Sequence, residues 1–252
     1  MEIAEHVDAL RRDGRLLADA AERAGLDAAV PSCPPWLVKD LLRHTGYIHR
    51  WAARHITERP GQIIDGPPEA EILRGGAPDP GLLDWFRAGH AALVDTLTAA
   101  DPAVECATFM AAPSPLAFWA RRQAHETAIH RADAESATGA TSEYPADFAA
   151  DGIDELIMGF GQRRKYRPAT SGDGSMQVLA TDTGDAWHLD VDQGRIQAHR
   201  GPGPGGCTVS GPASGVYLFL WNRPDDAQAN VTVTGDRDFL AAWQSSVRVR
   251  WG

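Results

Sequence analysis

Cysteine is scarce in this sequence, with only Cys33, Cys106 and Cys207 among 252 residues. Three scattered cysteines exclude a disulfide framework and a zinc site built from paired Cys-x-x-Cys motifs. We interpret each as a small, buried or half-buried side chain and expect a reducing compartment.

Positive charge and long apolar runs are also lacking. The 24 basic residues are outnumbered by 34 acidic ones, giving a net charge of −10, and only two of the basic residues are lysine. This balance disfavours nucleic acid and anionic membranes as partners. We find neither a membrane-spanning run nor an apolar signal core, and therefore expect a soluble, cytoplasmic protein.

Residues 1–145 have the hydrophobic periodicity of helices, with proline and glycine collected between them. The pattern predicts four helices, at 3–25, 36–58, 80–100 and 115–138, with a long loop over 59–81. We expect a four-helix bundle, an architecture that often builds metal sites from side chains on facing helices.

Residues 146–252 have a different pattern, with short β-rich runs between turn signals. We predict a helix at 147–162, a meander of three strands, a strand at 207–211, a helix at 212–223, a strand within 230–236 and a last helix at 236–246. The fold class is therefore α+β, a bundle followed by a small α+β domain.

The run RRQAHETAIH at 121–130 looks like the His-Glu-x-x-His helix of a zinc protease, but its histidines are five residues apart. On a helix His125 and His130 would point about 140° apart and could not share one ion. Glu126 and His130 are four apart and can converge on a metal. We interpret the arginine pairs at 121–122 and 163–164 as solvated helix faces.

A third ligand must come from another helix, and His44 is the best candidate. Leu37, Leu41, His44 and Ile48 form one stripe, so His44 interrupts an inward-facing apolar surface, while His49 falls outside it. A buried imidazole needs a partner. The residues alone leave two alternatives open for His44: a core histidine bonded to Glu126, or a metal ligand. Five other histidines have no partner at ligand spacing: His6, His55, His90, His188 and His199.

Two linked segments carry a resemblance to a known family. CPPWLVKDLLRHTGYIHRW and FWARRQAHETAIHRADAE, followed by a β-rich domain with LFLWNRP and VTVTGD, resemble the mycothiol-dependent maleylpyruvate isomerase family, whose N-terminal half is a DinB-like four-helix bundle. The resemblance implies a divalent metal, usually zinc, held by His44, Glu126 and His130. It places His125 on another helix face, as a packing or supporting group, and implies a sterol-carrier-like C-terminal domain.

The resemblance also implies mycothiol as cofactor, with its thiolate adding to a small-molecule electrophile, either for cis–trans isomerisation or for S-transfer. Arg223 of LWNRP is the candidate catalytic and cofactor-binding residue; capping the C-terminus of its own helix is the alternative. Two other functions remain open: a small-molecule or lipid-binding protein, and a metal hydrolase with Asp133 as base. We expect a monomer or a homodimer.

Overall fold

The computed structural model describes residues 1–163, 173–193, 195–223 and 230–247. These residues fall into two units that divide between Ser142 and Glu143. Each unit has its own core of buried apolar side chains. Among the residues that the structure describes, no helix combines the length and the apolar composition needed to cross a membrane.

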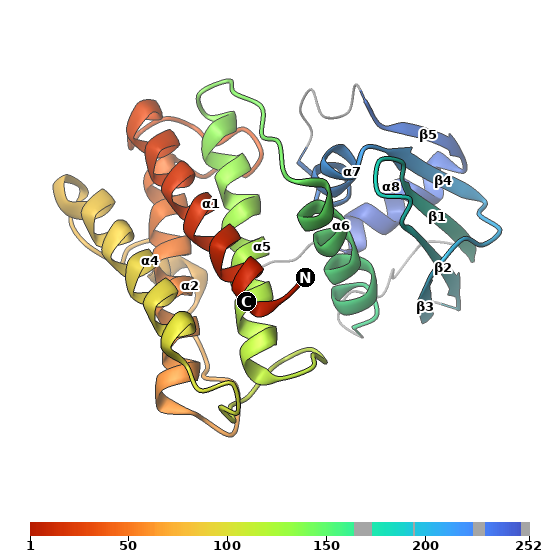
Figure 1. Ribbon diagram of the computed structural model, residues 1–252. Coiled ribbons are helices and arrows are strands. Elements are labelled where there is room, and N and C mark those ends of the chain that lie inside the picture. The colour runs from red at the N-terminus through yellow and green to blue at the C-terminus, as the bar shows by residue number, and fades with distance from the viewer. Residues whose placement is uncertain (164–172, 194, 224–229, 248–252) are drawn as a thin grey trace. The chain divides into compact units, whose positions relative to one another are not determined.

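The first unit is a bundle of four long helices (Figure 1). Its elements are α1 (Ile3–Ala24), α2 (Val38–Glu58), the short α3 (Glu69–Ile72), the 3₁₀ turn η1 (Asp79–Gly81), α4 (Leu82–Ala99) and α5 (Pro115–Ser136). Contacts are densest between α1 and α5 and between α2 and α4. The α2 and α5 helices also touch, and these two carry the candidate metal ligands.

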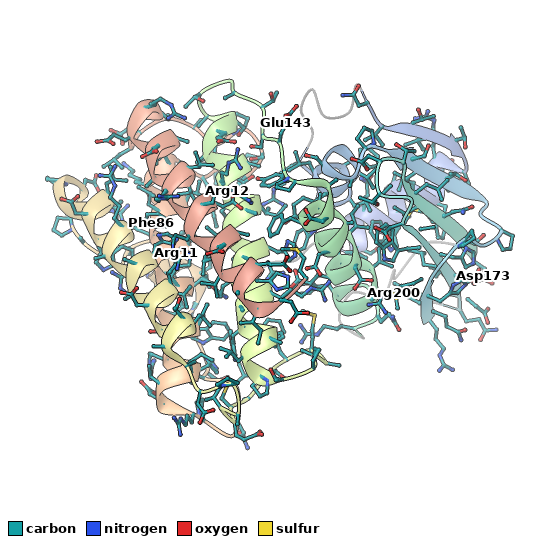
Figure 2. All side chains as sticks on the ribbon, viewed as in Figure 1. Arg11, Arg12, Phe86, Glu143, Asp173 and Arg200 are labelled. Carbon is teal, nitrogen blue, oxygen red and sulfur yellow. The ribbon has the colours of Figure 1, made fainter. Side chains whose placement is uncertain are left out.

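Apolar side chains from α1, α2 and α4 fill the centre of the bundle. Leu17, Leu41 and Phe86 are fully buried there, and Phe86 can be found on α4 in Figure 2. Arg11 and Arg12, on the other side of α1, reach the acidic residues beside them: Arg11 binds Asp8, and Arg12 binds Asp13. Most exposed residues of α1 are charged, as the helical period predicts, whereas Asp13 is fully buried and pairs with Arg12 and Arg131.

The second unit contains an antiparallel meander of three strands that is extended by two more strands, the first of which pairs in parallel with the meander. It contains α6 (Ala146–Asp154), the π-helical segment η2 (Glu155–Phe160), β1 (Gly174–Ala180), β2 (Ala186–Asp192), β3 (Arg195–Arg200), β4 (Cys207–Gly211), α7 (Ala213–Leu220), β5 (Thr232–Gly235) and α8 (Arg237–Ser246). The sheet order is β3-β2-β1-β4-β5. In this sheet β4 runs parallel to β1, whereas β1–β2, β2–β3 and β4–β5 are antiparallel.

Helices cover this sheet and bury alternate residues of its central strands. Met176, Val178 and Ala180 of β1 are buried, while their neighbours in the strand are half-buried. Both α7 and α8 contact β4, and α7 also contacts β1. Asp154, at the end of α6, accepts hydrogen bonds from the indole of Trp187 on β2 and from Arg200 on β3, and this ties α6 to the sheet. The chain is thus an α+β protein, as the sequence predicts.

Candidate metal centre

His44 enters the bundle from the second turn of α2 (Val38–Glu58), where it interrupts the apolar stripe. Only 5% of the residue is exposed. Its Nε2 lies 3.4 Å from Oε1 of Glu126, which is long for a hydrogen bond, and its buried Nδ1 has no hydrogen-bond partner among the described residues. A buried imidazole with neither nitrogen well bonded is costly, so this arrangement favours a further ligand over a purely structural histidine.

Glu126 and His130 come from one turn of α5. Their i, i+4 spacing places Nε2 of His130 3.2 Å from the same Oε1 of Glu126 that faces His44. The rings of His44 and His130 lie edge to face with their centroids 5.0 Å apart. Donor atoms from all three residues lie within 4.8 Å of one another. The structure therefore brings the three sequence-predicted ligands together.

These separations suit a zinc ion. Two ligand atoms bound tetrahedrally at about 2.0–2.1 Å from zinc are separated by about 3.3–3.4 Å. The two nitrogen–oxygen separations to Glu126 are 3.4 Å and 3.2 Å. The residues present thus fit a divalent metal with one carboxylate and two imidazole ligands, a set that leaves at least one coordination position for another molecule.

Asp133 contacts Nδ1 of His130, the ring nitrogen that does not face Glu126. One turn further along α5, its Oδ2 accepts a hydrogen bond from Nδ1 of His130 at 2.8 Å, while its Oδ1 accepts one from Ser32 at 2.5 Å. Asp133 is completely buried. A free general base needs an accessible oxygen, and both oxygens of Asp133 already have donors. The structure therefore disfavours Asp133 as the base of a hydrolase.

Arg122 supports Glu126 in a comparable way. Its guanidinium donates to Oε2 of Glu126 at 3.0 Å, so that Oε1 is the oxygen left facing both histidines. The interpretation of the 121–122 pair as a solvated face was wrong for Arg122, which is 3% exposed. The i, i+4 spacing of Arg122 and Glu126 was the signal available in the sequence.

Trp36 forms a wall of the centre. It is half-buried in the segment just before α2, and its ring centroid lies 5.0 Å from that of His44 and 6.3 Å from that of His130. The segment is held by a backbone bridge between Ala29 and Leu37. An apolar ring therefore lies beside both imidazole donors.

The three ligands differ in their acid–base behaviour. Burial would raise the pKa of Glu126, but hydrogen bonds from His130 and His44 and the charge of Arg122 outweigh it, and the pKa lies well below its usual range. Burial would also lower the pKa of His130, yet its bonds to Asp133 and Glu126 raise the pKa to about 9. Burial lowers the pKa of His44. A cation approaching Nε2 of His130 therefore competes with a proton.

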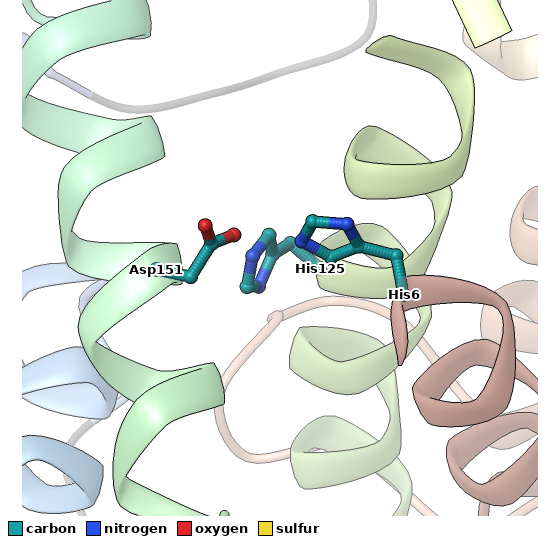
Figure 3. Close-up of side chains that lie close together, drawn as sticks. All are labelled: His6, His125 and Asp151. Carbon is teal, nitrogen blue, oxygen red and sulfur yellow. The ribbon is translucent and has the colours of Figure 1, made fainter. Parts of the chain in front are cut away.

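His125 lies on another face of α5, as its spacing predicts. Figure 3 shows its ring beside that of His6 from α1, and the two centroids are 6.1 Å apart. Both rings are buried. Three further buried histidines serve the bundle core: His49 contacts Thr127, His55 bonds to the backbone of Trp51 and Ile64, and His90 bonds to the carbonyl of Leu10.

Arg223 lies just beyond α7 in the second unit and is half-buried. Its guanidinium donates to the carbonyl of Trp221 at 2.8 Å, and its backbone N–H donates to the carbonyl of Leu218. These contacts agree with the helix-capping alternative. The catalytic and cofactor-binding role of Arg223 stays a prediction. Trp221 is buried and belongs to the core of its unit.

The fold and the donor set define a helical-bundle protein with a candidate metal centre and an appended α+β domain. The model of the mycothiol maleylpyruvate isomerase N-terminal domain matches residues 7–135, and the model of the C-terminal domain of the same family matches residues 147–242. The chain therefore belongs to the mycothiol maleylpyruvate isomerase family, an enzyme family. A search of curated proteins gave no match.

Two solved structures share the fold across almost the whole chain. One is a mycothiol-dependent maleylpyruvate isomerase, with 15% identity and a TM-score of 0.65. The other is a variant of such an isomerase with a histidine replaced by alanine, with 14% identity and the same TM-score. In both cases the alignment covers 93% of each chain. At this level of identity the comparison shows the fold, and the chemistry has to be argued from the residues.

Proposed function

We propose that this protein is a metal-dependent enzyme that uses mycothiol, with His44, Glu126 and His130 as its metal ligands and zinc as the metal. The observation that carries the proposal is that Nε2 of His44 and Nε2 of His130 both approach the same oxygen of Glu126, at 3.4 Å and 3.2 Å, with donor atoms of all three residues within 4.8 Å of one another. A scaffold has no need of this arrangement, which leaves His44 poorly bonded in a buried position.

A bound dication would supply the positive charge that keeps the thiol of mycothiol ionised at neutral pH. The protein's own residues prepare that position. Arg122 holds one oxygen of Glu126 and leaves the other facing the histidines. Asp133 holds Nδ1 of His130, so that Nε2 faces Glu126. The ring of Trp36 lies beside the rings of both histidines. The ligands are thus oriented before any metal or thiol arrives, which lowers the cost of ordering them.

The reaction that we propose is cis–trans isomerisation of an activated double bond, for which maleylpyruvate is the substrate to test first. When bound, mycothiol would supply a thiolate that adds reversibly to one carbon of the double bond, with the electron pair moving into the conjugated carbonyl. Rotation about the resulting single bond and elimination of the same thiolate would then exchange the cis and trans forms. Sulfur is neither consumed nor oxidised. S-transfer to an electrophile would begin in the same way but would consume the thiol.

The proposal is tested by turnover of maleylpyruvate with metal and mycothiol supplied separately. We expect protein stripped with a chelator to be inactive, and activity to need both added zinc and mycothiol. The free thiol should stay constant during turnover; a fall equal to the product formed would show S-transfer instead. Full activity of the metal-free protein, or activity without any thiol, would contradict the proposal.

The protein's own cysteines should be dispensable. Burial raises the pKa of the Cys106 and Cys207 thiols, so neither is a good nucleophile at neutral pH. We expect Cys33→Ser, Cys106→Ser and Cys207→Ala to keep most of the mycothiol-dependent rate. Rates should be compared at equal metal content. A folded, metal-loaded single variant without turnover would show that a protein thiol takes part in the reaction.

A binding function for the second unit is the other candidate. A cavity of about 390 Å³ lies among side chains of α7, β5 and α8, including Phe219, Val233 and Leu240. Arg237 and Gln244 also line it, so it suits a small molecule that carries both apolar and polar groups. Such a function would leave the donor set of the first unit without a purpose, so the enzymatic proposal explains more of the chain.

A further inference from the structure

Asp133 and Ser32 form a hydrogen-bonded pair next to the candidate metal position, without being among its three ligands. Asp133 is fully buried on α5, yet its partner Ser32 lies 101 residues earlier in the chain, in the segment before α2. Burying a carboxylate is costly unless every oxygen is hydrogen-bonded. Here one oxygen accepts from Ser32 and the other from His130.

This contact fixes the orientation of His130. Its Nδ1 donates to Asp133 at 2.8 Å, so the lone pair of the neutral ring lies on Nε2, the nitrogen 3.2 Å from Glu126. Without the acceptor the ring could turn about its Cβ–Cγ bond, or carry its proton on Nε2, and either change would remove the donor. A carboxylate behind a ligating imidazole also makes that imidazole a stronger electron donor.

We propose that Asp133, held in place by Ser32, is a positioning residue that presents Nε2 of His130 to the metal. The inference rests on the metal site of the proposed function. It assigns Asp133 no contact with metal or substrate. Ser32 contributes by locking the carboxylate rotamer, and it also ties the Trp36 segment to α5. Metal affinity should therefore depend on a side chain far from the ligands in the sequence.

The test is the zinc affinity of the full-length protein, measured by competition with a chromophoric chelator. Relative to wild type, Asp133→Asn should weaken zinc binding by about 10–100-fold. Asp133→Ala should weaken it at least as much, because it removes the acceptor altogether. Ser32→Ala, which leaves the carboxylate in place, should give a smaller loss. The Co²⁺ visible spectrum of Asp133→Asn should change as well, because the ligand field at His130 changes.

A matched control is Asp13→Asn. Asp13 is the other completely buried aspartate of the bundle and pairs with Arg131 and Arg12, away from the three ligands. We expect this variant to lower the melting temperature and to keep the zinc affinity of wild type. A purely structural Asp133 would behave in the same way, with lower stability and unchanged affinity, and that result would overturn the inference.

The outcomes separate this inference from the proposed function. If wild type binds no zinc, both fail. Zinc binding by wild type that is lost in His130→Ala would support the metal site. If Asp133→Asn and Ser32→Ala then bind zinc as tightly as wild type, only the positioning role fails. Should Asp133→Asn not fold, Ser32→Ala still decides, because an unchanged affinity in that variant contradicts the role given to Ser32.

Discussion

His130 illustrates how the candidate centre depends on individual atoms rather than on residue types. One ring nitrogen binds Asp133 and the other faces Glu126. The sequence predicts Glu126 and His130 as neighbours because they are four residues apart on a helix, and the stripe on α2 suggests His44. It could not predict Ser32 as a partner of Asp133, because that contact depends on tertiary packing between segments far apart in the chain.

The buried histidines His49 and His90, which are not among the proposed ligands, should make the protein sensitive to acid. Burial, followed by the charge of the neighbouring His90, keeps the pKa of His49 well below its usual value, and burial also lowers the pKa of His90. The folded state therefore binds fewer protons than the unfolded state below pH 6.5. The free energy of unfolding should fall by about 1.4 kcal/mol per pH unit for each such group, from about pH 6.5 down to its folded pKa.

The effect can be measured by urea unfolding of metal-free protein between pH 7 and pH 5. We expect His49→Asn to give a shallower loss of stability than wild type, although it can be less stable at pH 7. His199→Asn is the control, because His199 is exposed at the sheet edge. An identical pH slope in wild type and His49→Asn would show that His49 is not the cause.

At the level of helices and strands, the hydrophobic period predicted most boundaries within a few residues. The α2 helix begins at Val38 rather than at residue 36, because residues 29–37 form the bridged segment that carries Ser32 and Trp36. The four-residue α3 and the turn η1 lie in or at the end of the predicted loop, since such short elements have no period to detect. The parallel pairing of β1 with β4 joins strands that are far apart in the sequence, and the hydrophobic pattern within each strand does not predict its partner.

Gly14 shows why the bundle helices can approach so closely. A Cβ added to Gly14 on α1 would lie 2.1 Å from Nε2 of His90 on α4. That nitrogen donates to the carbonyl of Leu10, so the ring cannot easily move away. Although alanine is the better helix former by about 1 kcal/mol, we expect Gly14→Ala to lower the free energy of unfolding by about 1–3 kcal/mol through overpacking.

Denaturant unfolding checks this prediction, with the same substitution in a His90→Ser background as the control. The smaller serine removes the clash, so Gly14→Ala should cost less there than in wild type. Equal costs in the two backgrounds would mean that α1 and α4 are separated by something other than the His90 ring.

For the molecule as a whole, the sequence divides the chain at 145/146 and the structure divides it between Ser142 and Glu143. The sequence predicts this boundary because the hydrophobic pattern changes there from helical periodicity to short β-rich runs. The assignment of Arg223 in the second unit rests on its position at the end of an apolar helix and on the family resemblance. Its hydrogen bonds to the carbonyls of Trp221 and Leu218 are those of a residue that closes α7.

The division of labour between the two units predicts the behaviour of Arg223 variants. If Arg223 contacts mycothiol or an acidic substrate, Arg223→Ala should keep the metal content of wild type while reducing the mycothiol-dependent rate. Arg223→Lys should restore only part of that rate, because lysine lacks the planar fork of arginine. The melting temperature of each variant should be measured as well, because Arg223 also closes α7 and its loss can lower stability. A fully active Arg223→Ala would leave only the capping role.

The most direct test of the central claim is the metal content of the purified protein. Wild type, His44→Ala, Glu126→Gln, His130→Ala and the control His199→Ala should be prepared without a metal-binding tag and measured by elemental analysis. We predict about one zinc per chain in wild type and His199→Ala, and a strong loss in each of the three ligand variants. Equal metal in wild type and His130→Ala, with both proteins folded, would contradict the account.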